Sequence, residues 1–200
     1  IRGNALIIGP GHMRDLPRKH IAQQFSELTF IDIDDHGIKQ WQKEFPQKKT
    51  NVWIEDFTQI QGNIIREVDS IKALSLSDLL LKIAEVYNRH SSQKFSDNLP
   101  QTTYDFISAA VILSQVNTNL QHHYFSIIGQ TTLEHIFHEG TTLEQMALKT
   151  LESSYEKLAL KIQIDLISWM HSRLNKDGTL LLTMTPLVYQ DQYTPNSTSL

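Results

Sequence analysis

The 200-residue sequence contains no cysteine. This absence excludes a disulfide scaffold, a thiolate metal site, an iron–sulfur cluster and a cysteine nucleophile. The sequence also has no apolar run near the roughly 20 residues that a membrane-spanning helix needs, so we expect no membrane association. No signal peptide is visible in the chain, which begins with Ile1. We therefore expect a cytoplasmic protein.

A strongly basic charge balance is missing as well. The 18 lysines and arginines are outnumbered by 22 acidic residues, which gives a formal charge of −4. General binding to nucleic acid selects basic surfaces, so this balance argues against it. Hydrophobic residues make up 40% of the chain and charged residues 20%, a composition typical of globular proteins. For this length we expect a single domain over residues 1–200.

Short apolar runs indicate buried strands, and stretches with helical spacing separate them. The runs cover residues 5–8, 28–33, 52–54, 105–111 and 179–183. Strands that alternate with helices predict a doubly wound α/β fold with a mostly parallel sheet flanked by helices. Right-handed crossovers between consecutive strands favour the strand order 3-2-1-4-5.

Apolar residues three and four positions apart predict three helices. The longest stripe runs over residues 148–174 and is followed by a turn at 175–178. A second helix is predicted over 76–87, where Ser75 and Asp78 resemble a capping box, and a third over 38–45. The two long connections, 57–103 and 115–149, are expected to form helical insertions. In an open α/β sheet such insertions commonly lie over the ligand crevice.

The first strand leads directly into Gly9-Pro10-Gly11. Glycine at this point lets the backbone turn sharply and approach a ligand, although a plain turn between strand and helix explains the pattern equally well. Asp32 ends the second strand 21 residues after Gly11, a position suited to binding both hydroxyls of a ribose. The neighbouring Asp34 and Asp35 fit better as caps of the next helix.

The third strand ends at Asp56 and Phe57. An acid followed by an aromatic residue suits the exocyclic amine and the face of an adenine. The alternative is an acid in a solvated loop at a strand end. A nicotinamide-binding fold would want a small residue at position 14, and Arg14 therefore disfavours a dehydrogenase.

Several segments, taken in order along the chain, resemble the class I methyltransferases that use S-adenosylmethionine. They are Ala5–Gly11, Phe30–Asp34, Trp53–Phe57, Tyr104–Val116 and Leu174–Thr183. The resemblance implies a Rossmann-like fold and a methyl transfer reaction with S-adenosyl-L-methionine as cofactor.

The resemblance also assigns roles to residues of this sequence. It implies that Gly9 and Gly11 hold the methionine part of the cofactor and that Asp32 binds its ribose. By the same resemblance, Asp56 and Phe57 bind the adenine. It further implies that the methyl-donor pocket is lined by Ser108 and Ala109.

The sequence departs from this family at two places. Ile7 stands where family members usually carry an acid that organises the glycine loop. After the fifth predicted strand too few residues follow for the helix and strand that normally complete the sheet, so we expect either a truncated chain or a fold abridged at this end. These departures keep a second hypothesis open, namely a non-catalytic binding or regulatory module.

The methyl acceptor is expected to be a small polar molecule, because a nucleic-acid substrate would need a wide basic surface. His122 and His123 follow the fourth strand and are candidates for deprotonating the acceptor, with polar surface as the alternative. His135 and His138 with Glu139 have the spacing of metal ligands on a helix, but the sequence shows no clear third ligand. We expect no metal site.

Overall fold

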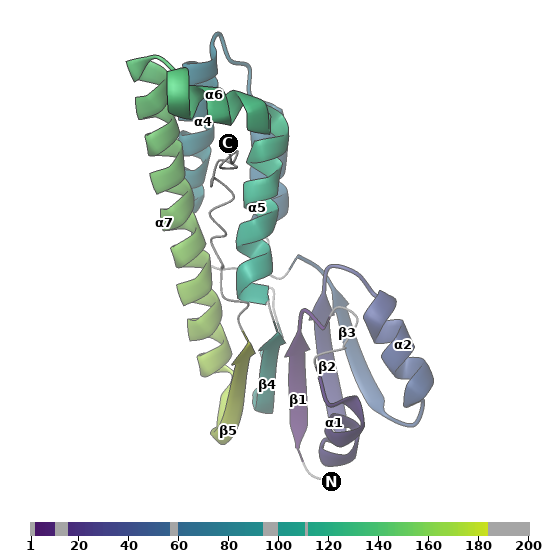
Figure 1. The fold of residues 1–200 in the computed structure, drawn as a ribbon. Helices are drawn as coiled ribbons and strands as arrows, with labels where there is room; N and C mark the ends of the chain where they lie inside the picture. Colours follow the sequence, from purple (N-terminus) through teal and green to yellow (C-terminus); the bar gives the residue numbers. More distant parts are fainter. Residues whose placement is uncertain (1–2, 11–15, 57–59, 94–99, 111, 184–200) are drawn as a thin grey trace, which may run out of the picture.

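Five parallel strands form one sheet in the order β3-β2-β1-β4-β5, as the sequence predicts (Figure 1). The computed structural model describes residues 3–10, 16–56, 60–93, 100–110 and 112–183. The strands are β1 (Asn4–Ile8), β2 (Glu27–Asp32), β3 (Lys49–Ile54), β4 (Tyr104–Ala110) and β5 (Leu174–Thr183). The predicted α/β class with a parallel sheet flanked by helices is confirmed.

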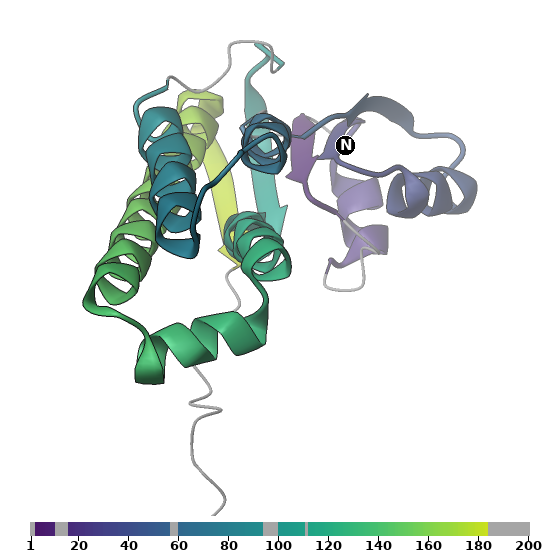
Figure 2. The same cartoon turned by 90° about the horizontal axis from the view of Figure 1, so that it is seen from above.

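Seven helices lie in the described part of the chain. They are α1 (Arg18–Gln24), α2 (His36–Glu44), α3 (Gln61–Asp69), α4 (Leu76–His90), α5 (Ile112–Ile128), α6 (Gln130–Glu139) and α7 (Thr142–Ser172). Figure 2 shows two separate groups, with the violet α1 and α2 beside β2 and β3 and the blue-to-green α4 to α7 beside β4 and β5. The long helices α4 and α7 confirm the stripes seen in the sequence, and Asp78 N donates to Ser75 Oγ at the start of α4.

Alternation along the strands divides the sheet residues between its two faces. In β1, Ala5 and Ile7 face the cluster built with α1 and α2, whereas Leu6 and Ile8 face the cluster built with α7. All four side chains are buried. Burial on both faces explains why β1 is a continuous apolar run rather than an alternating one.

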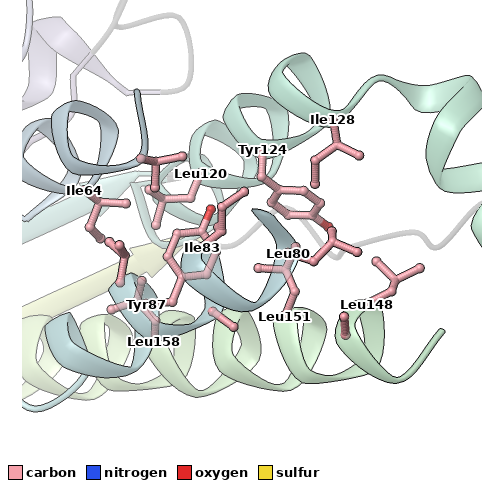
Figure 3. Close-up of a cluster of buried hydrophobic side chains, with 14 of the residues drawn as sticks. Ile64, Leu80, Ile83, Tyr87, Leu120, Tyr124, Ile128, Leu148, Leu151 and Leu158 are labelled. Atoms are coloured by element: carbon pink, nitrogen blue, oxygen red, sulfur yellow. The ribbon is translucent and has the colours of Figure 1, made fainter. Parts of the chain in front are cut away.

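The helices α3 to α7 also have a hydrophobic core of their own (Figure 3). Leu80, Tyr87, Tyr124 and Leu151 lie in it, from α4, α5 and α7. Figure 1 shows α4, α5 and α6 beyond the carboxyl ends of the strands, and α7 running from this group down beside β5. The helices α4, α5 and α6 of the insertions predicted at 57–103 and 115–149 thus lie on the carboxyl side of the sheet, whereas Thr103 lies at its amino side, where its carbonyl accepts a hydrogen bond from Asn4.

The fifth strand begins earlier than the sequence predicts. Leu174 already pairs with Tyr104, and Thr179 pairs with Phe106, so four residues of β5 bulge out against one residue of β4. Residues 175–178 lack the apolar pattern of a strand, so the sequence indicates a turn there. In the structure they form a bulge, which needs no such pattern. The third strand similarly begins at Lys49 rather than at position 52, because its first residues lie on a polar sheet edge.

Candidate functional site at the carboxyl edge of the sheet

The register of the sheet brings several of the predicted site residues to one edge. Ile8, the last residue of β1, lies opposite Ile31, and Asp32 lies opposite Ile54, the last residue of β3. Gly9 and Asp32 therefore end adjacent strands at the same level. Asp56 follows two residues after the end of β3. In open α/β sheets the carboxyl edge is where ligands bind.

Gly9 turns the chain away from β1. Its φ is +60°, in the left-handed region that glycine adopts readily, and its amide nitrogen donates to Ile31 O at 2.8 Å. The sheet ladder thus continues one residue past β1 before the chain leaves the edge. Gly11, the second predicted glycine of the loop, lies outside the described residues.

Asp32 is buried at the end of β2, on the sheet face that carries Phe30. Its Oδ1 accepts hydrogen bonds from the backbone amides of Ile33 at 2.7 Å and Asp34 at 3.3 Å. These bonds fix the carboxylate at the strand end.

The two following acids serve the start of α2, which fits the alternative role considered for them. Asp34 Oδ1 accepts a hydrogen bond from His36 N at 2.9 Å. Asp35 forms an ion pair with Lys39 one helical turn later, at 2.6 Å. Of the acids at 32, 34 and 35, Asp32 is therefore the one whose side chain is buried at the end of β2.

Asp56 lies between β3 and α3. Its Oδ2 accepts a hydrogen bond from Gly62 N, in the first turn of α3, at 3.3 Å. The carboxylate is partly buried, and this contact gives it a structural role at the start of the helix. Its predicted partner in adenine binding, Phe57, lies outside the described residues.

Ser108 and Ala109 lie in the last three residues of β4, close to the carboxyl edge of the sheet. They pair with Ile7 and Ile8 of β1, and both side chains are fully buried. Ser108 Oγ has no hydrogen-bond partner among the described residues. Position 7, where the resemblance leads one to expect an acid, is filled by an isoleucine that packs in the core with α1 and α2.

The two candidate histidines lie on α5, away from the strand ends. His122 is exposed, whereas His123 Nε2 lies 3.1 Å from Asp69 Oδ1 at the end of α3. His123 is 11 residues from the start of α5, about 16 Å along the helix at about 1.5 Å per residue. The structure therefore does not bring either histidine together with Gly9 and Asp32.

A metal site is not seen in the part of the chain that the structure describes: no three histidine or acidic side chains gather there in a way that suits an ion. His135 Nδ1 instead lies 3.4 Å from Glu139 Oε2 on the surface of α6. None of the described helices combines the length and the apolar character that a membrane span requires.

A surface hollow of about 500 Å³ between α3 and α4 was not anticipated from the sequence. An ion pair between Glu67 and Arg89 spans one end of it, and Lys82 Nζ donates to Lys72 O at the other. Lys82, Glu85 and Arg89 of α4 follow one another at spacings of three and four, so they share one helix face, and this spacing is the signal that the sequence offers. The hollow is separate from the carboxyl edge of β1 to β3.

Comparison with known protein families found no family model that matches the chain, and comparison with curated proteins found no match either.

Proposed function

We propose that the protein transfers a methyl group from S-adenosyl-L-methionine to a small polar acceptor. The observation that carries this proposal is the register of β1 and β2, in which Gly9 and the buried Asp32 end neighbouring strands side by side. A glycine turn next to an acid at this edge is the arrangement that suits an adenosine-containing ligand.

The chain's own residues have a limited task in such a reaction. The cofactor supplies the reactive methyl group, so the protein needs to bind it, orient it and exclude water. Gly9 gives the backbone room to approach the cofactor, and Asp32 offers a carboxylate to its ribose. The acids at 32, 34, 35, 55 and 56 also give this edge a negative character, which favours a cationic ligand.

A binding or regulatory module is the second candidate, and specific contacts favour it. Asp32 and Asp56 both use a carboxylate oxygen for backbone amides of their own loops. Ile7 leaves the glycine loop without the acid that the resemblance would supply. These contacts would preserve the fold of the edge even if no cofactor binds there.

Calorimetric titration with S-adenosylhomocysteine separates the two candidates. We expect the wild-type chain to bind it, and Asp32→Ala to weaken binding by about 1–3 kcal/mol, roughly 5- to 150-fold, through loss of charge-assisted hydrogen bonds. The matched control is Asp35→Asn, which removes a nearby acid paired with Lys39 and should leave the affinity unchanged. A folded wild-type chain that does not bind would support the binding or regulatory module instead.

A further inference from the structure

The hollow between α3 and α4, here called the α3–α4 hollow, combines an apolar patch with charges of both signs. Its volume of about 500 Å³ is within the roughly 300–1,000 Å³ of small-molecule sites. The apolar lining residues are Val86, which is buried, and Ile71, which is half-buried. The other lining residues are polar or charged: Glu67, Ser70, Lys72, Lys82, Glu85 and Arg89.

One end of the hollow carries a carboxylate that the surrounding fold holds in place. Glu67 Oε1 lies 3.1 Å from Nε2 of the buried His90, and Glu67 Oε2 accepts a hydrogen bond from Arg89 Nη2. The other ring nitrogen of His90, Nδ1, lies 2.9 Å from Gln93 Oε1, so the imidazole is held on both sides. Each oxygen of a carboxylate can accept a second hydrogen bond. Glu67 is therefore fixed before a ligand arrives and can still bind a cation.

The other end carries an ammonium group that is also held by its neighbours. Lys82 Nζ donates to Lys72 O at 2.7 Å and to Asp78 Oδ2 at 2.9 Å. An ammonium group has three N–H donors, so one donor of Lys82 is left for a ligand. The Lys72 ammonium forms no ion pair within the part of the chain that the structure describes. Both lysines can therefore bind one ligand carboxylate at this end.

The two ends are separated along α4. Lys82 and Arg89 are seven residues apart, which is about 10 Å at about 1.5 Å per residue. Glu85 lies between them on the same helix face, and its carboxylate has no ion pair among the described residues. A cationic group of a ligand thus finds two carboxylates, Glu67 and Glu85, at a distance from the lysines.

We propose that the α3–α4 hollow binds an ω-amino acid, a small zwitterion whose ammonium and carboxylate groups are joined by a chain of methylene groups. The ligand carboxylate pairs with Lys72 and Lys82, the ligand ammonium lies between Glu67 and Glu85, and the methylene chain packs over Val86. An α-amino acid does not fit, because its two charged groups share one carbon and cannot reach both ends. The hollow is separate from the carboxyl edge of β1 to β3, so this binding does not depend on the proposed cofactor.

The exposure of the hollow sets its expected strength. The side chains of Glu67 and Lys82 are 40% and 39% exposed, and ion pairs that water reaches contribute little individually. The fold already holds these two side chains, so a ligand does not have to order them. We therefore expect weak binding that requires both charges on one molecule.

Calorimetric titration of the full chain with ε-aminocaproate tests the proposal. We expect saturable binding of ε-aminocaproate. Glycine lacks the separation between the charges, and caproate and hexylamine each lack one charge, so we expect each of them to bind weaker by about tenfold or more. Equal binding of caproate or hexylamine, or no saturable binding of ε-aminocaproate, overturns the proposal.

Substitutions in the hollow locate the binding. Lys82→Met should weaken binding of ε-aminocaproate by about tenfold or more, because a charged contact is lost. The matched control is Lys39→Met, because Lys39 pairs with Asp35 four residues away on α2, as Lys82 does with Asp78 on α4. Glu85→Gln should also weaken binding, and it breaks no ion pair of the described chain. An equal loss in Lys39→Met, or unchanged affinity in both Lys82→Met and Glu85→Gln, contradicts the proposed site.

Discussion

The hydroxyl of Tyr87 is a polar group that the helical core leaves unsatisfied. The side chain is fully buried, and its OH has no hydrogen-bond partner among the described residues. Burial, together with the nearby Tyr124 and Tyr155, raises the pKa of Tyr87 above its ordinary value. The group therefore stays neutral, and its aromatic ring contributes to stability while its hydroxyl does not.

Two substitutions of Tyr87 separate the ring from the hydroxyl. Tyr87→Phe should leave the free energy of unfolding within about 1 kcal/mol of the wild type or raise it, because no native hydrogen bond is lost. Tyr87→Ala should lower it by about 3–5 kcal/mol, because the core loses an aromatic ring. Urea unfolding measures both. A large loss for Tyr87→Phe would mean that the hydroxyl has a partner.

Asp105 of β4 links β1 and β5 near the amino ends of these strands. Its carboxylate also makes the free energy of unfolding depend on pH. It accepts hydrogen bonds from the side chain of Asn175, at 2.6 Å, and from the backbone amide of Asn4, at 2.9 Å. In that order of importance, these two bonds lower the pKa of the Asp105 carboxyl. A lowered pKa in the folded state stabilises the protein above the unfolded value, near pH 4, and this contribution is lost as pH falls through the folded pKa.

Asp105→Asn removes this titration. We expect the variant to be less stable than the wild type at pH 7, and the difference between them to shrink as the pH is lowered from about 5 to 3. Thermal unfolding of both chains over this range measures the difference. A gap that stays constant down to pH 3 would show that the charge of Asp105 does not contribute to stability.

At the scale of elements, the junction of α6 and α7 needs a glycine for a steric reason. A Cβ on Gly140 would lie 2.5 Å from Ile136 O, a backbone atom that cannot easily move. Gly140→Ala should therefore lower the free energy of unfolding by about 1–3 kcal/mol.

Gly62 in α3 is the matched control, because a Cβ there meets no atom within 4 Å. Gly62→Ala should raise the free energy of unfolding by about 0.5–1 kcal/mol through its better helix propensity. Denaturant unfolding of both variants compares them directly. Equal effects of the two substitutions would remove the close contact as the explanation.

The sequence predicts those elements whose apolar pattern is strong. β1 and α7 are examples, because burial on both faces of the sheet or along one helix stripe leaves a regular pattern. The bulge at 175–178 could not be read in this way, because its residues are polar and only the pairing with β4 makes them part of a strand. The helix α3 has a weak signal, Ile60, Ile64 and Val68 at spacings of four, within a polar segment.

The candidate site also combines features that the sequence predicts with features that it does not. The positions of Gly9 and Asp32 at adjacent strand ends follow from strand order and could be predicted. The hydrogen bonds that Asp32 and Asp56 make to nearby amides depend on loop geometry, which no periodicity encodes. The position of His123 beside Asp69 also escaped prediction, because it depends on where α3 and α5 pack together.

At the scale of the whole molecule, α7 connects two hydrophobic cores. Its Leu151 and Leu158 lie in the helical core, and its Leu166 and Met170 lie in the core against the sheet. A continuous helix of 31 residues should couple the unfolding of the two cores. The single domain expected from the sequence therefore predicts one cooperative transition.

Leu151→Ala tests this coupling from the helical side. We expect a loss of about 2–5 kcal/mol for truncating a fully buried leucine. Tryptophan fluorescence should report the same shifted midpoint as far-ultraviolet circular dichroism, because Trp41, Trp53 and Trp169 all lie in the clusters packed on the sheet. If the tryptophan signal kept its wild-type midpoint, the helical core and the sheet would be separate folding units.

In the function that we propose, the carboxyl edge of β1 to β3 binds an adenosine-containing cofactor. Hydrogen–deuterium exchange of the chain with and without S-adenosylhomocysteine measures this binding at the strand ends themselves. We expect slower exchange at the ends of β1, β2 and β3, around Gly9, Asp32 and Asp56, and no change in α6 or in the hollow between α3 and α4. Unchanged exchange at these strand ends under saturating S-adenosylhomocysteine, or protection confined to the α3–α4 hollow, would contradict it.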